Sequence, residues 1–162
     1  MEGYICCFTG HREIVTRHAK KLPEKMEKAL EYLYEKGVRI FRAGGALGFD
    51  TVAALSVIEF RKTHSDVKLH LMLPCRDQEK FWNLRSKMIY RQIIRKSDEV
   101  EYVTDKYTSS CMFERNRRMV DGSHICVAYY DGGSGGTGYT YSYAKKKGIK
   151  VINLYDSLDK EE

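Results

Sequence analysis

Short apolar runs alternate along the chain with longer segments in which apolar residues recur every three or four positions. The first pattern is typical of buried strands and the second of amphipathic helices. Strands are expected at 4–9, 38–43, 67–73, 99–104, 125–130 and 151–155. Helices are expected at 22–36, 49–62, 77–96, 111–120 and 137–147. The pattern therefore predicts an α/β protein.

Repeated strand–helix units predict a parallel sheet that is covered by helices on both faces. With right-handed crossovers, the expected fold is a Rossmann-like three-layer αβα sandwich whose mainly parallel sheet has the order 4-3-2-1-5-6. The winding then reverses between the first and fifth strands, and ligands of such sheets bind at the carboxyl ends of the strands beside that reversal. We expect one domain over residues 1–155 and a polar C-terminal tail over 156–162.

A glycine-rich loop at 132–138 joins the fifth strand to the last helix. Glycine lets a ligand approach the backbone closely, and the start of a helix offers free N–H groups to a phosphate. The loop matches neither GxGxxG nor GxxxxGK[ST], so a flexible surface turn is the alternative interpretation. Five flanking tyrosines are expected to divide between pocket wall, packing and a partner subunit: Tyr129, Tyr130, Tyr139, Tyr141 and Tyr143.

Two other turns are expected in the same crevice, although they lie far away in the sequence. One follows the first strand, and the second contains a glycine pair after the second strand. This convergence supports a phosphate pocket more strongly than any one loop. The candidate ligand-binding residues are Thr9, Gly10, His11, Arg12, Gly44, Gly45, Asp50, Arg115, Asp131, Gly132, Gly133, Ser134, Gly135, Gly136 and Thr137.

The side chains in these turns suit a phosphorylated ligand. Arg12 offers a rigid fork of donors to phosphate, and His11 can donate to phosphate or transfer a proton. Asp50 is interpreted either as a residue that orients the loop or accepts a ribose hydroxyl, or as an ordinary carboxylate in a first helical turn. The candidate catalytic residues are Arg115, Asp50, Glu114 and Asp131.

The arginines of the predicted helix at 111–120 and the aromatic pair at 81–82 are interpreted mainly as structural residues. Arg115 and Arg118 are expected on one face of their helix, while Arg117 and Arg118 are interpreted as part of a solvated basic surface. Phe81 and Trp82 are interpreted mainly as core residues, with stacking on a base as the alternative.

The composition limits the compartment and the partners. The net charge of +6 allows an anionic partner, with a nucleotide favoured over nucleic acid. No apolar run approaches the ~20 residues of a membrane span, and no signal-peptide pattern is present, so we expect a cytoplasmic protein without membrane contact. The five cysteines lack a CxxC pair, which predicts reduced, buried thiols and no metal site.

Several motifs together carry a resemblance to a known family. They are CCFTGHR at 6–12, FRAGGALGFDTVAA at 41–54, LPCRDQEKFW at 73–82, ERNRRMVDGSH at 114–124 and YYDGGSGGTGYTYSYAKKKG at 129–148. The chain resembles the YpsA-like family of the bacterial SLOG superfamily, which also includes the lonely-guy (LOG) phosphoribohydrolases and DprA. The resemblance implies a Rossmann-like fold, a pocket for an ADP-ribose-, NAD- or nucleoside phosphate-like ligand, and a role as sensor or regulator. LOG-like relatives imply a homodimer.

The same resemblance defines the alternatives. LOG enzymes carry PGGxGTxxE in this loop. Gly136 and Thr137 match its GT pair, whereas Thr140 stands at the position of the catalytic glutamate. A phosphoribohydrolase is therefore the weaker alternative to a binding protein, and whether the chain is an enzyme stays open. The run Arg115-Asn116-Arg117 is similar to one in DprA, which makes DNA binding a second alternative.

Overall fold

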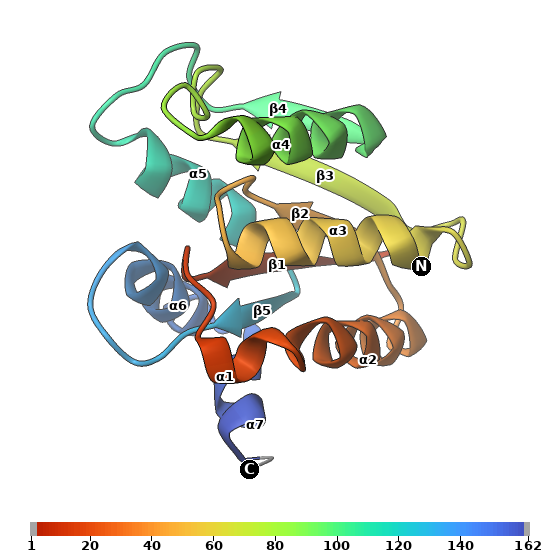
Figure 1. Cartoon of the computed structure of the whole chain (residues 1–162). Helices are drawn as coiled ribbons and strands as arrows, with labels where there is room; N and C mark the ends of the chain where they lie inside the picture. Colours follow the sequence, from red (N-terminus) through yellow and green to blue (C-terminus); the bar gives the residue numbers. More distant parts are fainter. Residues whose placement is uncertain (1–2, 161–162) are drawn as a thin grey trace.

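The fold is built on a six-stranded parallel sheet. The computed structural model describes residues 3–160 (Figure 1). The strands pair in the order β4-β3-β2-β1-β5-β6, and every pairing is parallel, which confirms the predicted order. They are β1 (Tyr4–Gly10), β2 (Val38–Ala43), β3 (Lys68–Leu73), β4 (Glu99–Tyr102), β5 (Ile125–Tyr129) and β6 (Lys150–Asn153).

Helices cover both faces of the sheet, and their mutual contacts define two outer layers. Neighbouring helices α2, α3 and α4 contact one another in turn, and α1 and α7 contact α2, whereas α5 and α6 pack together (Figure 1). No helix within residues 3–160 is long and apolar enough to cross a membrane. The helices are α1 (Thr16–Ala19), α2 (Leu22–Glu35), α3 (Phe49–Arg61), α4 (Leu84–Lys96), α5 (Cys111–Val120), α6 (Gly136–Lys146) and α7 (Leu154–Lys160).

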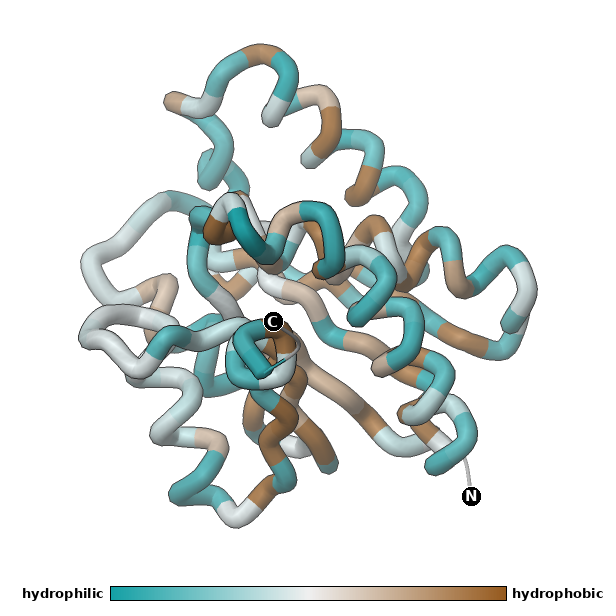
Figure 2. The backbone as a smooth tube through the Cα atoms, turned by 60° about the horizontal axis from the view of Figure 1, so that its bottom comes forward, coloured by the Kyte–Doolittle hydropathy of each residue, from teal (hydrophilic) through white to brown (hydrophobic). Residues whose placement is uncertain are grey.

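Buried residues form two clusters, and strands β1 and β5 contribute side chains to both. All residues of β5 are buried, as expected for a parallel strand that is covered on both faces. Phe8 of β1 stacks on Phe41 at 5.9 Å between ring centroids, and Phe49 stacks on Tyr129 at 5.7 Å. In Figure 2 the apolar segments concentrate in the interior strands and the hydrophilic ones along the helices. Strand pairing and this packing place the carboxyl ends of β1 and β5 side by side.

All five cysteines are free and buried, as predicted. Burial raises the pKa of the Cys6 thiol well above its usual range, so this group stays protonated. Cys6 therefore acts as a small apolar side chain of the core.

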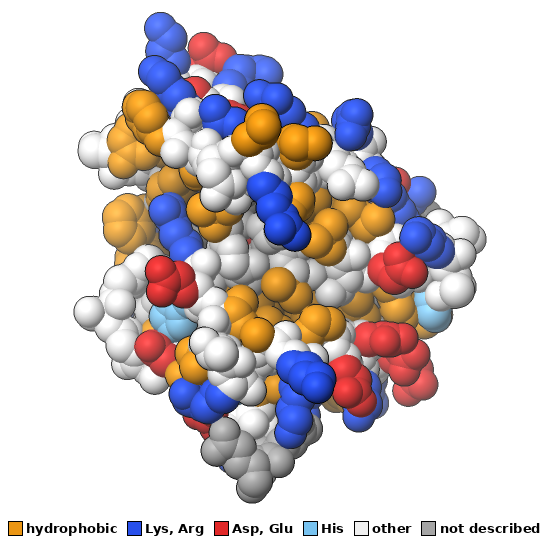
Figure 3. Space-filling model, viewed as in Figure 1, with side chains coloured by type: hydrophobic (Ala, Val, Ile, Leu, Met, Phe, Trp, Pro, Cys, Tyr) orange, Lys and Arg blue, Asp and Glu red, His pale blue; other side chains and the backbone are white. Residues whose placement is uncertain are grey.

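The helix predicted at 77–96 was wrong over residues 77–83. Helix α4 begins only at Leu84, because the Asn83 side chain caps it by accepting from Ser86 N at 2.8 Å. Phe81 is 90% exposed, so its assignment to the core was also wrong, whereas Trp82 is half-buried and packs against Tyr90. Figure 3 shows Lys and Arg side chains gathered around the exposed apolar residues over α4.

The predicted polar tail is helical as far as the structure describes it. Helix α7 includes Leu154 and Leu158, which are both buried. Its Asp159 carboxylate contacts Nε2 of the buried His18 at 2.6 Å, and His18 Nδ1 lies 2.7 Å from the Tyr129 hydroxyl. Residues 161–162 lie outside the described part of the chain. Helix α7 is thus part of the domain and packs beneath β5.

Candidate functional site

A cavity of about 360 Å³ lies at the carboxyl ends of β1 and β5, where the winding of the sheet reverses. Four segments that are distant in sequence form its wall: the turn after β1, the start of α3, helix α5 and the glycine loop. The lining residues are Phe8, Thr9, Gly10, His11, Arg12, Ala46, Asp50, Met112, Arg115, Asn116, Ser134, Gly136 and Thr137. We call this space the crevice cavity.

His11 and Asp131 join the two sides of this cavity. Nε2 of His11 lies 3.0 Å from Asp131 Oδ1 and 3.0 Å from the Asp131 backbone N. A protonated Nε2 donates to the carboxylate, whereas an unprotonated one accepts from the backbone N–H. The hydrogen bond from Gly133 N, at 2.8 Å, and the nearby His11 lower the pKa of Asp131. Asp131 therefore stays ionised and orients the loop.

Asp50 is the carboxyl group at the bottom of the cavity. It is 6% exposed, and its Oδ2 accepts a hydrogen bond from Ala46 N at 3.2 Å. Burial raises the pKa of Asp50 to about 6, while the charges of Arg115 and Arg12 oppose that rise. A buried carboxyl beside cations, with a pKa near neutrality, can both hold the preceding loop and exchange a proton.

Arg115 projects from α5 into the same place. It is 5% exposed and donates to the carbonyl oxygen of Gly44 and, at 2.7 Å, to Asn116 Oδ1. Burial lowers the pKa of Arg115, and the Asp50 carboxylate counteracts this effect. Arg118, three positions further along α5, is instead exposed and paired with Glu114 and Glu101, so the two arginines have different surroundings.

The glycine loop has a defined shape. The Tyr130 hydroxyl donates to Gly133 O at 2.5 Å, and a Cβ at Gly138 would lie 2.8 Å from that same oxygen. Gly135, the N-cap of α6, has a φ of 121°, which other residues rarely adopt. No side chain caps this helix end. The first N–H groups of α6 consequently remain available to a ligand at Gly136 and Thr137.

The structure brings most predicted site residues together but separates others from the cavity. Nine of them line it: Thr9, Gly10, His11, Arg12, Asp50, Arg115, Ser134, Gly136 and Thr137. Gly44 and Gly45 are buried behind Arg115 and Leu73. Glu114 is exposed and accepts a hydrogen bond from Arg118. Thr140 is 2% exposed and donates to Gly136 O at 3.0 Å, so it faces the helix rather than the cavity.

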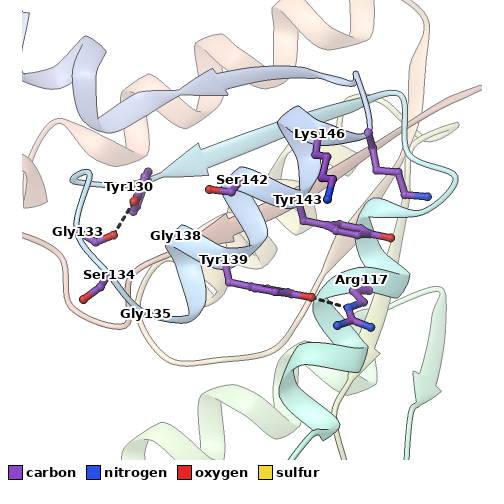
Figure 4. Close-up of a pocket in the computed structure, with 11 residues that line it drawn as sticks. Arg117, Tyr130, Gly133, Ser134, Gly135, Gly138, Tyr139, Ser142, Tyr143 and Lys146 are labelled. Atoms are coloured by element: carbon purple, nitrogen blue, oxygen red, sulfur yellow. Dashed lines mark hydrogen bonds between the residues drawn. The ribbon is translucent and has the colours of Figure 1, made fainter.

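A second, larger cavity of about 970 Å³ is lined by residues of α5, the glycine loop and α6 (Figure 4). We call it the tyrosine cavity. Sequence reasoning missed its basic side chains, although the spacing of Tyr139 and Tyr143 on one helix face was a usable signal. Its lining residues are Arg117, Tyr130, Gly133, Ser134, Gly135, Gly138, Tyr139, Ser142, Tyr143, Lys146 and Lys147. Across residues 3–160, His, Cys, Asp and Glu form no cluster of three that could hold a metal ion.

Comparison with known proteins identifies the family. The sequence pattern of the YspA SLOG family matches residues 6–157. The chain belongs to the YpsA family of SLOG proteins. The match includes β1 from Cys6 onward, the other five strands and the lining residues of both cavities, so both cavities lie within the family domain.

Two relatives and one solved structure are similar to this family member. The SPbeta prophage-derived protein YoqJ of Bacillus subtilis (strain 168) is 35% identical over 139 residues, which are 78% of this chain and 81% of YoqJ. A UPF0398 protein of Bacillus pumilus (strain SAFR-032) is 32% identical over 109 residues, 66% of this chain and 59% of that protein. The DNA processing protein A of Helicobacter pylori has the same fold, with a TM-score of 0.66 and 15% identity over 93% of this chain and 64% of that one.

Proposed function

We propose that the protein binds a nucleotide or a nucleotide derivative through a phosphate group in the crevice cavity and acts as a sensor or regulator of that ligand. The observation that carries the proposal is the convergence of Arg12, Arg115 and the start of α6 on one cavity. The cavity volume, 360 Å³, lies within the range of about 300–1,000 Å³ that is usual for small-molecule sites.

The electrostatics of the crevice cavity favour an anion. Two guanidinium groups and the positive end of the α6 dipole face a single lining carboxyl group, that of Asp50. Arg115 is held by its bond to Gly44 O, so it needs little reorganisation when a ligand enters. Arg12 is exposed and free to close on a phosphate.

Thermal unfolding with AMP, ADP-ribose and NAD tests this proposal. We expect a ligand of this set to raise the melting temperature of the wild type and to lose that effect in the variants Arg12→Ala and Gly136→Val. The Cβ position of Gly136 meets no atom within 4 Å, so valine is compatible with the fold while it fills the space beside the first N–H groups of α6. Lys28→Ala, which removes a charge on the far helix α2, is the control. A panel without effect at millimolar concentration, with folded variants, would overturn the proposal.

A second candidate function is hydrolysis of the N-glycosidic bond of a nucleoside phosphate, which releases the base. One observation favours it. Asp50 is buried in the cavity with a pKa of about 6, which suits a general acid or base. The position of the LOG glutamate is filled by Thr140, which supplies no carboxylate. Chromatography of nucleoside monophosphates incubated with the protein distinguishes the two functions. Base release that disappears in Asp50→Asn would establish the enzyme, and no release above the buffer blank would leave binding alone.

A further inference from the structure

The crevice cavity and the tyrosine cavity share one lining residue, Ser134 of the glycine loop, and both are lined by residues of α5 and α6. Gly135 and Gly136 follow Ser134, and neither would bring a Cβ within 4 Å of another atom. We propose that the two cavities form one bipartite site for a dinucleotide, that is, two nucleosides linked through phosphates. This inference rests on the proposed function, because the first phosphate would occupy the crevice cavity.

Tyr139 provides a preformed aromatic platform in the tyrosine cavity. Its hydroxyl accepts a hydrogen bond from Arg117 Nε at 2.5 Å, and its ring meets the Phe113 ring edge-on at 5.0 Å between centroids. Tyr143 lies parallel to it, with an interplanar angle of 8° and 6.4 Å between centroids (Figure 4). The rings are therefore held before any ligand arrives. Nucleobases stack on the faces of aromatic side chains that are fixed in this way.

The same cavity carries positive charge beside these rings. Arg117, Lys146 and Lys147 line it, and no carboxylate is among its lining residues. The neighbouring Asp121 accepts from the Tyr143 hydroxyl at 2.8 Å and lies 3.5 Å from Lys147 Nζ, which fixes both groups. Aromatic rings with cations above them suit a ligand that is both planar and anionic.

The joint geometry distinguishes a dinucleotide from a mononucleotide. A mononucleotide that occupies the crevice cavity leaves the Tyr139 ring and three cations unused. A second nucleoside, linked through phosphate, can extend from one cavity to the other past Ser134, which lines both. The phosphate link would pass the exposed N–H groups at the start of α6.

Isothermal titration with AMP and with diadenosine pyrophosphate tests this inference. We expect the wild type to bind the dinucleotide about 10-fold more tightly than AMP, the usual contribution of one stacked base. Tyr139→Ser should abolish that difference and leave the AMP affinity unchanged. Lys146→Glu, at an exposed position that preserves the fold, should weaken only the dinucleotide. Tyr107→Ser and Lys28→Glu are the controls, because both residues are exposed and line neither cavity.

The outcomes separate this inference from the proposed function. If AMP binds and depends on Arg12, but the dinucleotide gains nothing from Tyr139, the bipartite site is wrong and the phosphate site stands. If neither compound binds, both fail. A single-stranded oligothymidylate that depends on Tyr139, when diadenosine pyrophosphate does not, would overturn the dinucleotide in favour of nucleic acid.

Discussion

His11 and Asp131 are 120 positions apart in the chain, yet His11 Nε2 lies 3.0 Å from Asp131 Oδ1. The contact joins the turn after β1 to the loop after β5, the two paired strands at which the winding of the sheet reverses. It also holds the carboxylate where it accepts the Gly133 N–H at 2.8 Å. The shape of the glycine loop therefore depends on a residue at the opposite end of the sequence.

Replacement of Asp131 by alanine should loosen this loop without unfolding the domain. The Gly133 N–H loses its acceptor, and His11 loses the carboxylate and keeps only the backbone N–H of residue 131. The residues involved are not buried. We expect faster hydrogen exchange of the Gly133 amide, measured by NMR, with little change in melting temperature. Asp105→Ala, in an exposed ion pair with Arg76 elsewhere, is the control. Unchanged exchange at Gly133 would show that Asp131 does not hold the loop.

Asp50 should make the stability of the protein depend on pH between about 4 and 6. Burial raises its pKa to about 6 in the folded state, above the value of about 4 in an unfolded chain. The folded protein then binds more protons in that window, so the free energy of unfolding falls as the pH rises through it. The loss is complete above the folded pKa and amounts to at most about 3 kcal/mol.

Urea unfolding of the wild type and Asp50→Asn at several pH values measures this effect. Asparagine retains an oxygen that can accept from Ala46 N but does not ionise. The wild type should lose stability relative to the variant from pH 4 to pH 7. Parallel stability curves would mean that Asp50 titrates as an ordinary surface carboxyl. Glu24→Gln, at an exposed site, provides the reference for removal of one carboxylate.

Gly48 and Gly148 form a matched pair, since both have a φ of 79°. A Cβ at Gly48 would lie 2.2 Å from the Arg12 carbonyl oxygen, whereas one at Gly148 would meet no atom within 4 Å. Gly148→Ala should cost only the strain of a left-handed conformation, about 1 kcal/mol. Gly48→Ala should cost clearly more and displace the turn that carries Arg12. Chemical unfolding of both variants tests the comparison, and equal costs would contradict the close contact.

His18 should contribute strongly to stability because it links α1, β5 and α7. It is 2% exposed and lies between the Tyr129 hydroxyl and the Asp159 carboxylate. His18→Ala leaves a cavity and removes one of the two partners of the Tyr129 hydroxyl, which keeps only the Val15 N–H, so we expect the free energy of unfolding to drop by about 2–4 kcal/mol. His70→Ala, at a more exposed position on β3, should cost less. Similar losses in the two variants would argue against a special role for His18.

The sheet order could be predicted because its signals are local. Most strands contain a short apolar run, although β4 has the sequence EVEY, and the handedness of crossovers then leaves few arrangements. The start of α4 could not be predicted in this way. Phe81, Leu84 and Met88 have helical spacing but are all exposed, and the helix instead buries Tyr90 and Ile93. Helix α7 was missed because only Leu158 interrupts an otherwise polar end of the chain.

The crevice cavity could be predicted in outline because turns at the ends of adjacent parallel strands must lie together. The burial of Arg115 and its bond to Gly44 depend on how deeply α5 packs, which no local pattern reveals. The tyrosine cavity escaped prediction for the same reason. Arg117 meets Tyr139 only because α5 and α6 pack side by side.

The central claim is that phosphate binding in the crevice cavity depends on Arg12. The most direct test is an isothermal titration of AMP into the wild type, Arg12→Ala and Lys28→Ala under the same conditions. Arginine–phosphate contacts are strong, so the account predicts at least about 10-fold weaker binding for Arg12→Ala and unchanged binding for Lys28→Ala. Equal affinities in all three proteins, or no binding to the wild type, would contradict it.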